Sequence, residues 1–179
     1  MTGVPADDLR EAALARFDAL RDRLAPELEK LLDCPAHTRI KIKGVPHIAV
    51  PQQPGVYLFT EDSKHRYVGR SKNLNMRLGH HTQPRSGENS APFAFNIARR
   101  AALEAGFAVA GRSRESLGAD GVFVEKYFAP AKERVRAMEF RFVTFNPDEP
   151  DADAFSTIFE VYAAMVLGTD GDFNLFHTH

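Results

Sequence analysis

Residues 55–81 of the chain read GVYLFTEDSKHRYVGRSKNLNMRLGHH, and this stretch decides the fold. Its first part, GVYLFT, and the later HRYVG are rich in β-branched and aromatic residues, which favours two strands. The polar residues 61–64 between them predict a turn, so the two strands are expected to form a hairpin. Tyr57 and Tyr67 stand 10 residues apart, and the return strand would place the second tyrosine near the first.

A short helix over residues 73–81 is expected directly after the hairpin. Arg77 and His81 are four positions apart in it, so they share one helix face. The hairpin and this helix would gather two phenols, a guanidinium and an imidazole, which suits work on a phosphodiester. Each group also has a plainer interpretation, because strand tyrosines often fill a core edge and a helix arginine is usually solvated.

A second helix is predicted from about Ala152 to Leu167, closed by Gly168. Between residues 154 and 168 its sequence is AFSTIFEVYAAMVLG, in which Glu160 is the only charged residue. A carboxylate on such an apolar helix needs a partner or access to water. Glu160 therefore lies on a solvent-exposed face of the helix or pairs with an arginine. Alternatively, it serves as a metal ligand or general acid/base in a cleft.

The ordered set of these motifs resembles the GIY-YIG nuclease family. The similarity spans residues 55–174 and rests on GVY, YVG, the helix of Arg77 and the helix of Glu160. Valine replaces the usual isoleucine in both tripeptides and preserves their strand character. The resemblance implies an α/β fold with a small, mainly antiparallel sheet of three or more strands flanked by helices. It also implies a metal-dependent endonuclease that hydrolyses DNA phosphodiester bonds with Mg²⁺ or Mn²⁺.

The resemblance also implies a role for each residue of the site. Glu160 would hold the metal ion, whose charge offsets that of the phosphate and the leaving alkoxide. Arg77 would grip the scissile phosphate, and Tyr57 would orient or deprotonate the attacking water with the help of nearby positive charge. Tyr67 would bond to phosphate or water. The predicted catalytic residues are Tyr57, Tyr67, Arg77, His81, Glu160 and Asn174, and the metal ligand is Glu160. The first five are expected to converge on one solvent-accessible concave surface.

Overall charge gives no support to nucleic-acid binding, because the net charge of the 179 residues is −1. A binding surface would have to be a local basic patch. Residues 82–137 form an insertion larger than the compact family core needs, and it carries many basic side chains. A solvated helix face explains such residues equally well. The candidate nucleic-acid-binding residues are Lys64, Arg66, Arg70, Lys72, Arg99 and Arg100.

Two domains are expected: residues 1–50 as an N-terminal helical extension and connector, and residues 51–179 as the nuclease-like domain. Within the extension, apolar residues recur every three or four positions over 6–33, which predicts an amphipathic helix kinked or split at Pro26. This helix could mediate dimerisation or bind a protein partner, or it could pack on its own domain.

Other segments carry weaker signals. RIKIK at 39–43 and HIAV at 47–50 could be short strands, and residues 93–106 predict a helix with a glycine stop. Residues 107–137 are ambiguous but could be helical up to Pro130. MEFRFVTF at 138–145 alternates and predicts a strand.

The chain is expected to be cytoplasmic, because it has a single cysteine, Cys34, and shows neither a signal-peptide pattern nor an apolar run of membrane-spanning length. The alternative to the DNA endonuclease is a non-catalytic nucleic-acid-binding or assembly module with the same fold. A nuclease that acts on RNA is a third, weaker interpretation.

Overall fold

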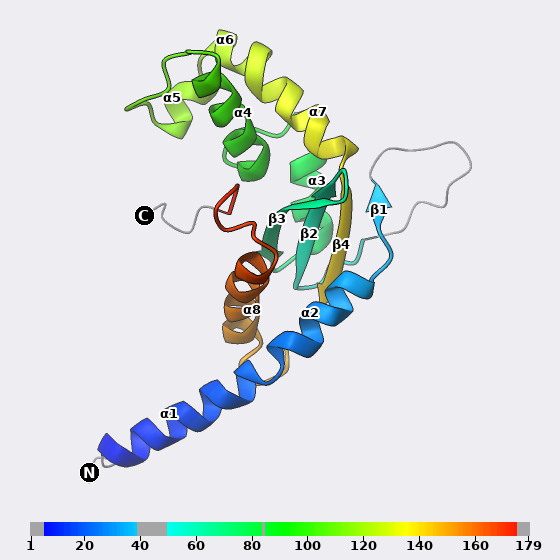
Figure 1. Cartoon of the computed structure of the whole chain (residues 1–179), viewed down its shortest axis with the longest axis vertical. Coiled ribbons are helices and arrows are strands. Elements are labelled where there is room, and N and C mark those ends of the chain that lie inside the picture. Colours follow the sequence, from blue (N-terminus) through cyan, green and yellow to red (C-terminus); the bar gives the residue numbers. More distant parts are fainter. Residues whose placement is uncertain (1–5, 39–49, 84, 175–179) are drawn as a thin grey trace.

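The computed structural model describes residues 6–38, 50–83 and 85–174 of the chain (Figure 1). At its centre lies a four-stranded sheet in the order β1-β4-β2-β3, in which every neighbouring pair is antiparallel. Helices flank this sheet, so the predicted α/β fold with a small antiparallel sheet is confirmed. The strands are β1 (His37–Thr38), β2 (Gly55–Glu61), β3 (Lys64–Ser71) and β4 (Glu139–Thr144).

The predicted hairpin is formed by β2 and β3, with Tyr57 opposite Gly69 and Phe59 opposite Tyr67. Its turn residues Asp62 and Ser63 both have positive φ, 50° and 60°, a conformation that suits the twist of a tight hairpin. β3 pairs only with β2 among the described strands and therefore forms an edge of the sheet.

The helices in chain order include three short pieces after α4 that the sequence left ambiguous. One of these, η1, is a π-helical turn that runs directly into α7. The helices are α1 (Ala6–Arg21), α2 (Leu24–Asp33), α3 (Leu74–Thr82), α4 (Pro92–Glu104), α5 (Arg114–Gly118), α6 (Gly121–Phe123), η1 (Val124–Phe128), α7 (Ala129–Ala137) and α8 (Ala152–Val166). None of these described helices combines the length and hydropathy needed to cross a bilayer.

Successive side chains of β2 point to opposite faces of the sheet, and they contribute to two apolar clusters, one on each face. Tyr57 and Phe59 point to the face covered by α3, α4 and α7. Val56 and Leu58 point to the other face, where α2 and α8 supply the apolar side chains. The two helices that carry Arg77 and Glu160 therefore cover opposite faces, and their side chains can meet only around the edge formed by β3 (Figure 1).

Two observed helix boundaries differ from those predicted from the sequence. The N-terminal helix is split as predicted, but the break falls at residues 22–23, and Pro26 lies within the first turn of α2, where a proline is tolerated. The helix of residues 121–137 does not stop at Pro130, so that expectation was wrong. The wider π turn η1 just before Pro130 relieves the clash between its ring and the preceding turn. RIKIK and most of HIAV lie outside the described residues.

Candidate active site

The site begins with the close approach of Tyr57 to Gly69 on the neighbouring strand. A Cβ atom at position 69 would lie 2.4 Å from the Tyr57 hydroxyl oxygen and 2.9 Å from the Tyr67 ring. The phenol of Tyr57 therefore crosses β3 through the space that Gly69 leaves open, and its hydroxyl reaches toward the edge of the sheet. Only glycine permits this path, which explains why YVG ends in that residue.

His81 meets the hydroxyl of Tyr57 from α3. The Tyr57 hydroxyl oxygen lies 2.8 Å from His81 Nε2, and both side chains are fully buried. Burial, followed by the charges of Arg77 and His80, lowers the pKa of His81 from 6.5 to about 3, so its imidazole is neutral at neutral pH. Burial, followed by the neighbouring Tyr67, raises the pKa of Tyr57 well above 10, so its phenol is protonated.

Local sequence explains how α3 presents its functional face. Its cap residue, Asn73, accepts a hydrogen bond from the backbone N–H of Met76 at 2.9 Å. Leu74 and Leu78 are completely buried and anchor the helix against the sheet. His81 lies one turn beyond Arg77, so the arrangement predicted from their spacing is present.

Tyr67 occupies the position between the buried pair and the surface. Its ring is partly buried and stacks on Phe93 of α4 with centroids 4.6 Å apart. Burial and the charge of Glu160 raise its pKa to about 12, against the opposing charges of Arg77 and Arg114. Tyr67 is therefore protonated, and the charges of Glu160 on α8 and of two guanidinium groups, Arg77 and Arg114, act on it.

Arg77 and Glu160, which lie on opposite faces of the sheet, line the same hollow at its edge. This hollow has a volume of about 530 Å³, and its wall includes backbone and side chains at the end of β3 and the start of α3. Arg77 is partly exposed, and its guanidinium makes no hydrogen bond or ion pair with any described residue, although its backbone N–H donates to the Asn73 carbonyl at 3.1 Å. The lining residues are Arg70, Ser71, Lys72, Asn73, Met76, Arg77, His80 and Glu160.

Glu160 is paired with Arg70 in this state. Arg70 Nε lies 3.1 Å from Glu160 Oε2, and the carboxylate side chain is 19% exposed. Burial raises the pKa of Glu160, and the guanidinium of Arg70 opposes this effect. Sequence reasoning had placed Arg70 among the residues that bind nucleic acid, whereas the structure puts it beside the candidate metal ligand.

The fit of a divalent ion can be judged from the donors around Glu160. No group of three or more His, Cys, Asp or Glu side chains that could hold a metal exists among the described residues. A single carboxylate facing an open hollow suits Mg²⁺ or Mn²⁺, hard cations that keep several water ligands and share them with substrate phosphate. The residues fit such an ion, provided that it competes with Arg70 for the carboxylate.

Asn174 lies away from the hollow and braces β3. Its side-chain Oδ1 accepts from the Val68 N–H at 2.9 Å, and its Nδ2 donates to the Val68 carbonyl at 2.5 Å. Both bonds are buried. Asn174 therefore holds the segment after α8 against the same strand that carries Tyr67.

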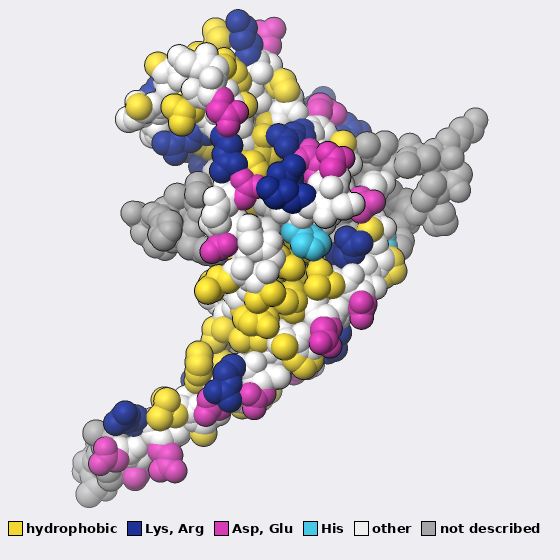
Figure 2. Space-filling view, viewed as in Figure 1, with side chains coloured by type: hydrophobic (Ala, Val, Ile, Leu, Met, Phe, Trp, Pro, Cys, Tyr) yellow, Lys and Arg dark blue, Asp and Glu magenta, His cyan; other side chains and the backbone are white. Residues whose placement is uncertain are grey.

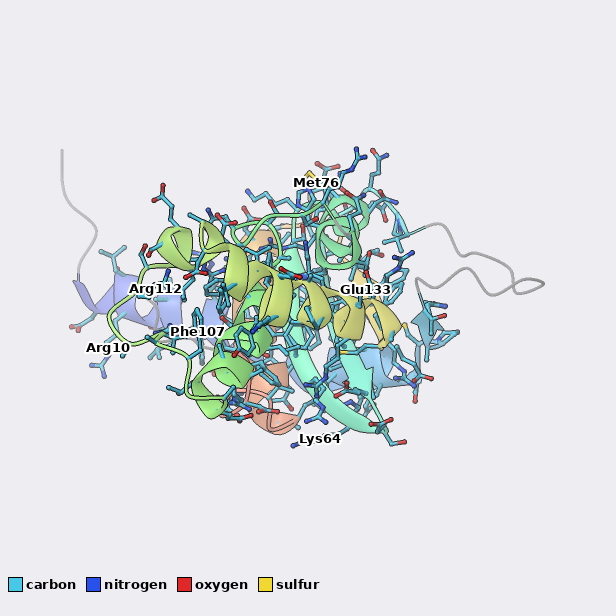
Figure 3. All side chains as sticks on the ribbon, turned by 90° about the horizontal axis from the view of Figure 1, so that it is seen from above. Arg10, Lys64, Met76, Phe107, Arg112 and Glu133 are labelled. Atoms are coloured by element: carbon cyan, nitrogen blue, oxygen red, sulfur yellow. The ribbon has the colours of Figure 1, made fainter. Side chains whose placement is uncertain are left out.

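The candidate nucleic-acid-binding residues do not form one continuous free surface. Arg66 pairs with Glu61 at 3.1 Å, and Lys72 pairs with Asp153 at 3.3 Å. Lys64, Arg66 and Arg100 all approach Asp172. In Figure 3, Lys64 at the hairpin end lies on the opposite side of the molecule from Met76, which lines the hollow. Arg99 is exposed on α4.

The predicted convergence on one accessible surface is therefore only partly observed. Arg77 and Glu160 line the hollow and Tyr67 is partly buried, but Tyr57 and His81 are covered completely. Phe93, which stacks on Tyr67, was missed, and Arg114 was foreseen only as one basic residue of the insertion, not as a charge that acts on Tyr67. Both come from the 82–137 segment, where no local motif marked them.

Part of this site matches a known family. Residues 53–103 match the GIY-YIG catalytic domain. The match includes the GIY-YIG hairpin and α3, and with them Tyr57, Tyr67, Arg77 and His81, so the resemblance read from the motifs is confirmed over these residues. It ends before Glu160 and Asn174. Comparisons with the curated proteins and with the solved structures gave no match.

Proposed function

We propose that this chain is a metal-dependent endonuclease that hydrolyses DNA phosphodiester bonds. The observation that carries the proposal is the shared hollow of Arg77 and Glu160, which come from helices on opposite faces of the sheet and from positions 83 residues apart. A family whose matched domain has a nuclease function supports the same conclusion.

Arg77 is the group best placed to hold the scissile phosphate. Its guanidinium lines the hollow and forms no ion pair with a described residue, so it can donate two parallel hydrogen bonds to phosphate oxygens without first breaking an ion pair. His80 lines the same wall and can add a further donor.

Glu160 would hold Mg²⁺ or Mn²⁺, and the bound ion would supply charge stabilisation for the phosphate and the leaving oxygen. Arg70, which pairs with Glu160 at 3.1 Å, would have to release the carboxylate for such an ion to bind, and its guanidinium could then donate to phosphate.

The buried pair of Tyr57 and His81 fits a positioning role better than that of a base. A phenol with a pKa well above 10 does not release its proton readily, and an imidazole with a pKa of about 3 does not accept one at neutral pH. We therefore assign Tyr57 and His81 to holding Tyr67 and α3 in place. Tyr67 is the tyrosine that can contact phosphate or water.

The ion pair between Arg70 and Glu160 favours one alternative, a non-catalytic nucleic-acid-binding or assembly module. A carboxylate satisfied by an arginine has no need of a metal. Direct measurement of metal binding separates the two functions.

The deciding experiment replaces Glu160 with Gln and, as a matched control, Glu133 with Gln, because Glu133 is a 61% exposed carboxylate on α7. Supercoiled, linear, branched and single-stranded DNA, and RNA, are incubated with Mg²⁺ or with EDTA. We expect cleavage of DNA in Mg²⁺, its loss in EDTA, and a fall of at least about 100-fold in E160Q but not in E133Q. Calorimetric titration with Mn²⁺ should show binding to wild type and E133Q but not to E160Q.

Two results would count against this assignment. Cleavage by E160Q near the wild-type rate would remove Glu160 from the mechanism. Absence of both cleavage and Mn²⁺ binding in the folded wild-type protein would favour the assembly module.

From the sequence we also propose that residues 51–179 form the nuclease-like domain, with an insertion at about 82–137, and that residues 1–50 form an N-terminal extension. The proposed substrate is DNA rather than RNA, and the proposed location is the cytoplasm.

A further inference from the structure

The N-terminal helix α1 projects from the rest of the molecule, and most of its surface is uncovered (Figure 1). Every side chain from residue 7 to residue 19 is exposed, and Leu20 is the first buried one. The exposed side chains include three large apolar ones: Leu9 at 58%, Leu14 at 55% and Phe17 at 51%. Figure 2 shows hydrophobic side chains along this projecting helix, beyond the apolar surface of the main body.

The anchored end of α1 explains why the helix is held at that angle. Arg16 pairs with Asp151, and Arg23 pairs with Glu149 at 3.1 Å while its guanidinium lies 4.1 Å from the centre of the Phe155 ring. These contacts hold the second half of α1 beside the start of α8. Residues 7–13 make no such contact with the described residues, and an isolated helix of this length is marginal in water even with good helix formers.

The charges of α1 are distributed unevenly along its length. Its first turn carries Asp7 and Asp8, and its last turn carries Arg21. In an antiparallel pair of α1 helices centred on Leu14, Asp7 lies opposite Arg21 of the second copy, and Arg10 lies opposite Asp18 of the second copy. The helix dipoles also oppose each other in that arrangement. A parallel pair would instead set like charges side by side at each end.

We infer that α1 is the interface through which two copies of this chain form a two-fold symmetric dimer. The free half of each helix lies along the anchored half of the other, and Leu14 and Phe17 supply the apolar contact. The same patch is used on both copies, as two-fold symmetry requires. This inference is independent of the proposed nuclease activity.

The size of the interface predicts its strength. A helix of 16 residues is about 24 Å long. Two such helices in contact along their length bury an area near the lower bound for specific interfaces, about 1,000 Å² in total. A dimer that dissociates reversibly at micromolar concentration is therefore expected.

The first test measures the mass of the full chain in solution by light scattering and sedimentation between about 1 and 100 µM. Wild type should rise toward twice its single-chain mass of 19.9 kDa as concentration increases. The double variant with Leu14→Glu and Phe17→Glu should remain at the single-chain mass, and its melting temperature should equal that of the wild-type monomer, because both side chains are exposed. Leu103→Glu, a change at a 62% exposed leucine on α4, is the matched control and should dimerise like wild type.

The second test determines the direction of the helices by oxidative cross-linking in a Cys34→Ser background. Leu14→Cys should cross-link, since it lies at the centre of the pair. Arg10→Cys, which shares a helix face with Leu14, should not, because antiparallel helices would separate its two copies by about 12 Å, too far for a disulfide.

Three outcomes would overturn the inference. They are a single-chain mass for wild type at every concentration, an undiminished dimer in the double variant, and loss of the dimer in Met165→Glu, a change on α8, instead of in the α1 variants. Cross-linking at both cysteine positions would refute the antiparallel arrangement.

Discussion

Gly69→Ala should damage the candidate site far more than it damages the fold. The added Cβ would lie 2.4 Å from the Tyr57 hydroxyl oxygen, whereas ordinary contacts begin at 3.4 Å, so the phenol must move by about 1.0 Å. Overpacking of this kind costs about 1–3 kcal/mol of folding free energy. Displacement of a site residue by about 1 Å can lower the rate by about 100-fold. The same movement breaks or lengthens the 2.8 Å contact with His81.

The assay combines urea unfolding with DNA cleavage in Mg²⁺ for wild type, Gly69→Ala and the control Gly79→Ala. Gly79 lies in α3, and a Cβ there would meet nothing closer than 3.4 Å, so alanine should preserve or slightly raise stability. A second variant, Gly69→Ala with Tyr57→Leu, should recover part of the lost stability without recovering activity. A Gly69→Ala variant that unfolds at the wild-type urea concentration and cleaves at the wild-type rate would show that Tyr57 does not depend on the space at position 69.

Three further predictions concern other parts of the molecule. The pKa of His81 is about 3 in the folded chain and 6.5 in the unfolded chain, so between pH 6.5 and pH 3 only the unfolded chain takes up this proton. The free energy of unfolding should therefore fall by up to about 1.4 kcal/mol for each pH unit over that range. In His81→Gln, the free energy of unfolding should fall less steeply as the pH is lowered. Asn174→Ala should cost about 1–3 kcal/mol and speed amide exchange at Val68, while Asn89→Ala at an exposed position should do neither. Arg99→Glu should weaken DNA binding at low salt and leave stability unchanged. Arg100→Glu should weaken DNA binding and also lower stability, because Arg100 pairs with Asp172. DNA binding that does not change with salt concentration would contradict a phosphate-binding role for both arginines.

Local patterns predicted the parts of the fold that are local. The hairpin followed from two runs of β-branched and aromatic residues around a polar turn, and α8 followed from an apolar helix with a glycine just beyond its end. The continuation of the helix beyond Pro130 was not predicted, because a π turn depends on how the whole segment packs over α4. No single residue type indicates such a turn.

The same distinction applies to the site. Spacing alone indicated that Arg77 and His81 share a helix face. Burial of His81 could not be predicted, since it depends on Phe59 and Phe93, which lie far from it in sequence and pack within about 6.4 Å of its ring. The ion pairs of Lys72 with Asp153 and of Arg66 with Asp172 likewise arise from tertiary structure, because these two partners come from other segments, although Arg66 also pairs with Glu61 within the hairpin.

Asn174 also has a consequence for how this protein behaves when concentrated. A strand at the edge of a sheet offers its backbone N–H and C=O groups to any extended chain that passes, which is a route to intermolecular aggregation. At Val68 both groups are already occupied by one amide side chain, which imitates the pairing of a neighbouring strand. The bracing residue thus also closes the middle of β3 to strand addition, so the open edge needed by Arg77 and Glu160 is confined to the end of the strand where the hollow lies.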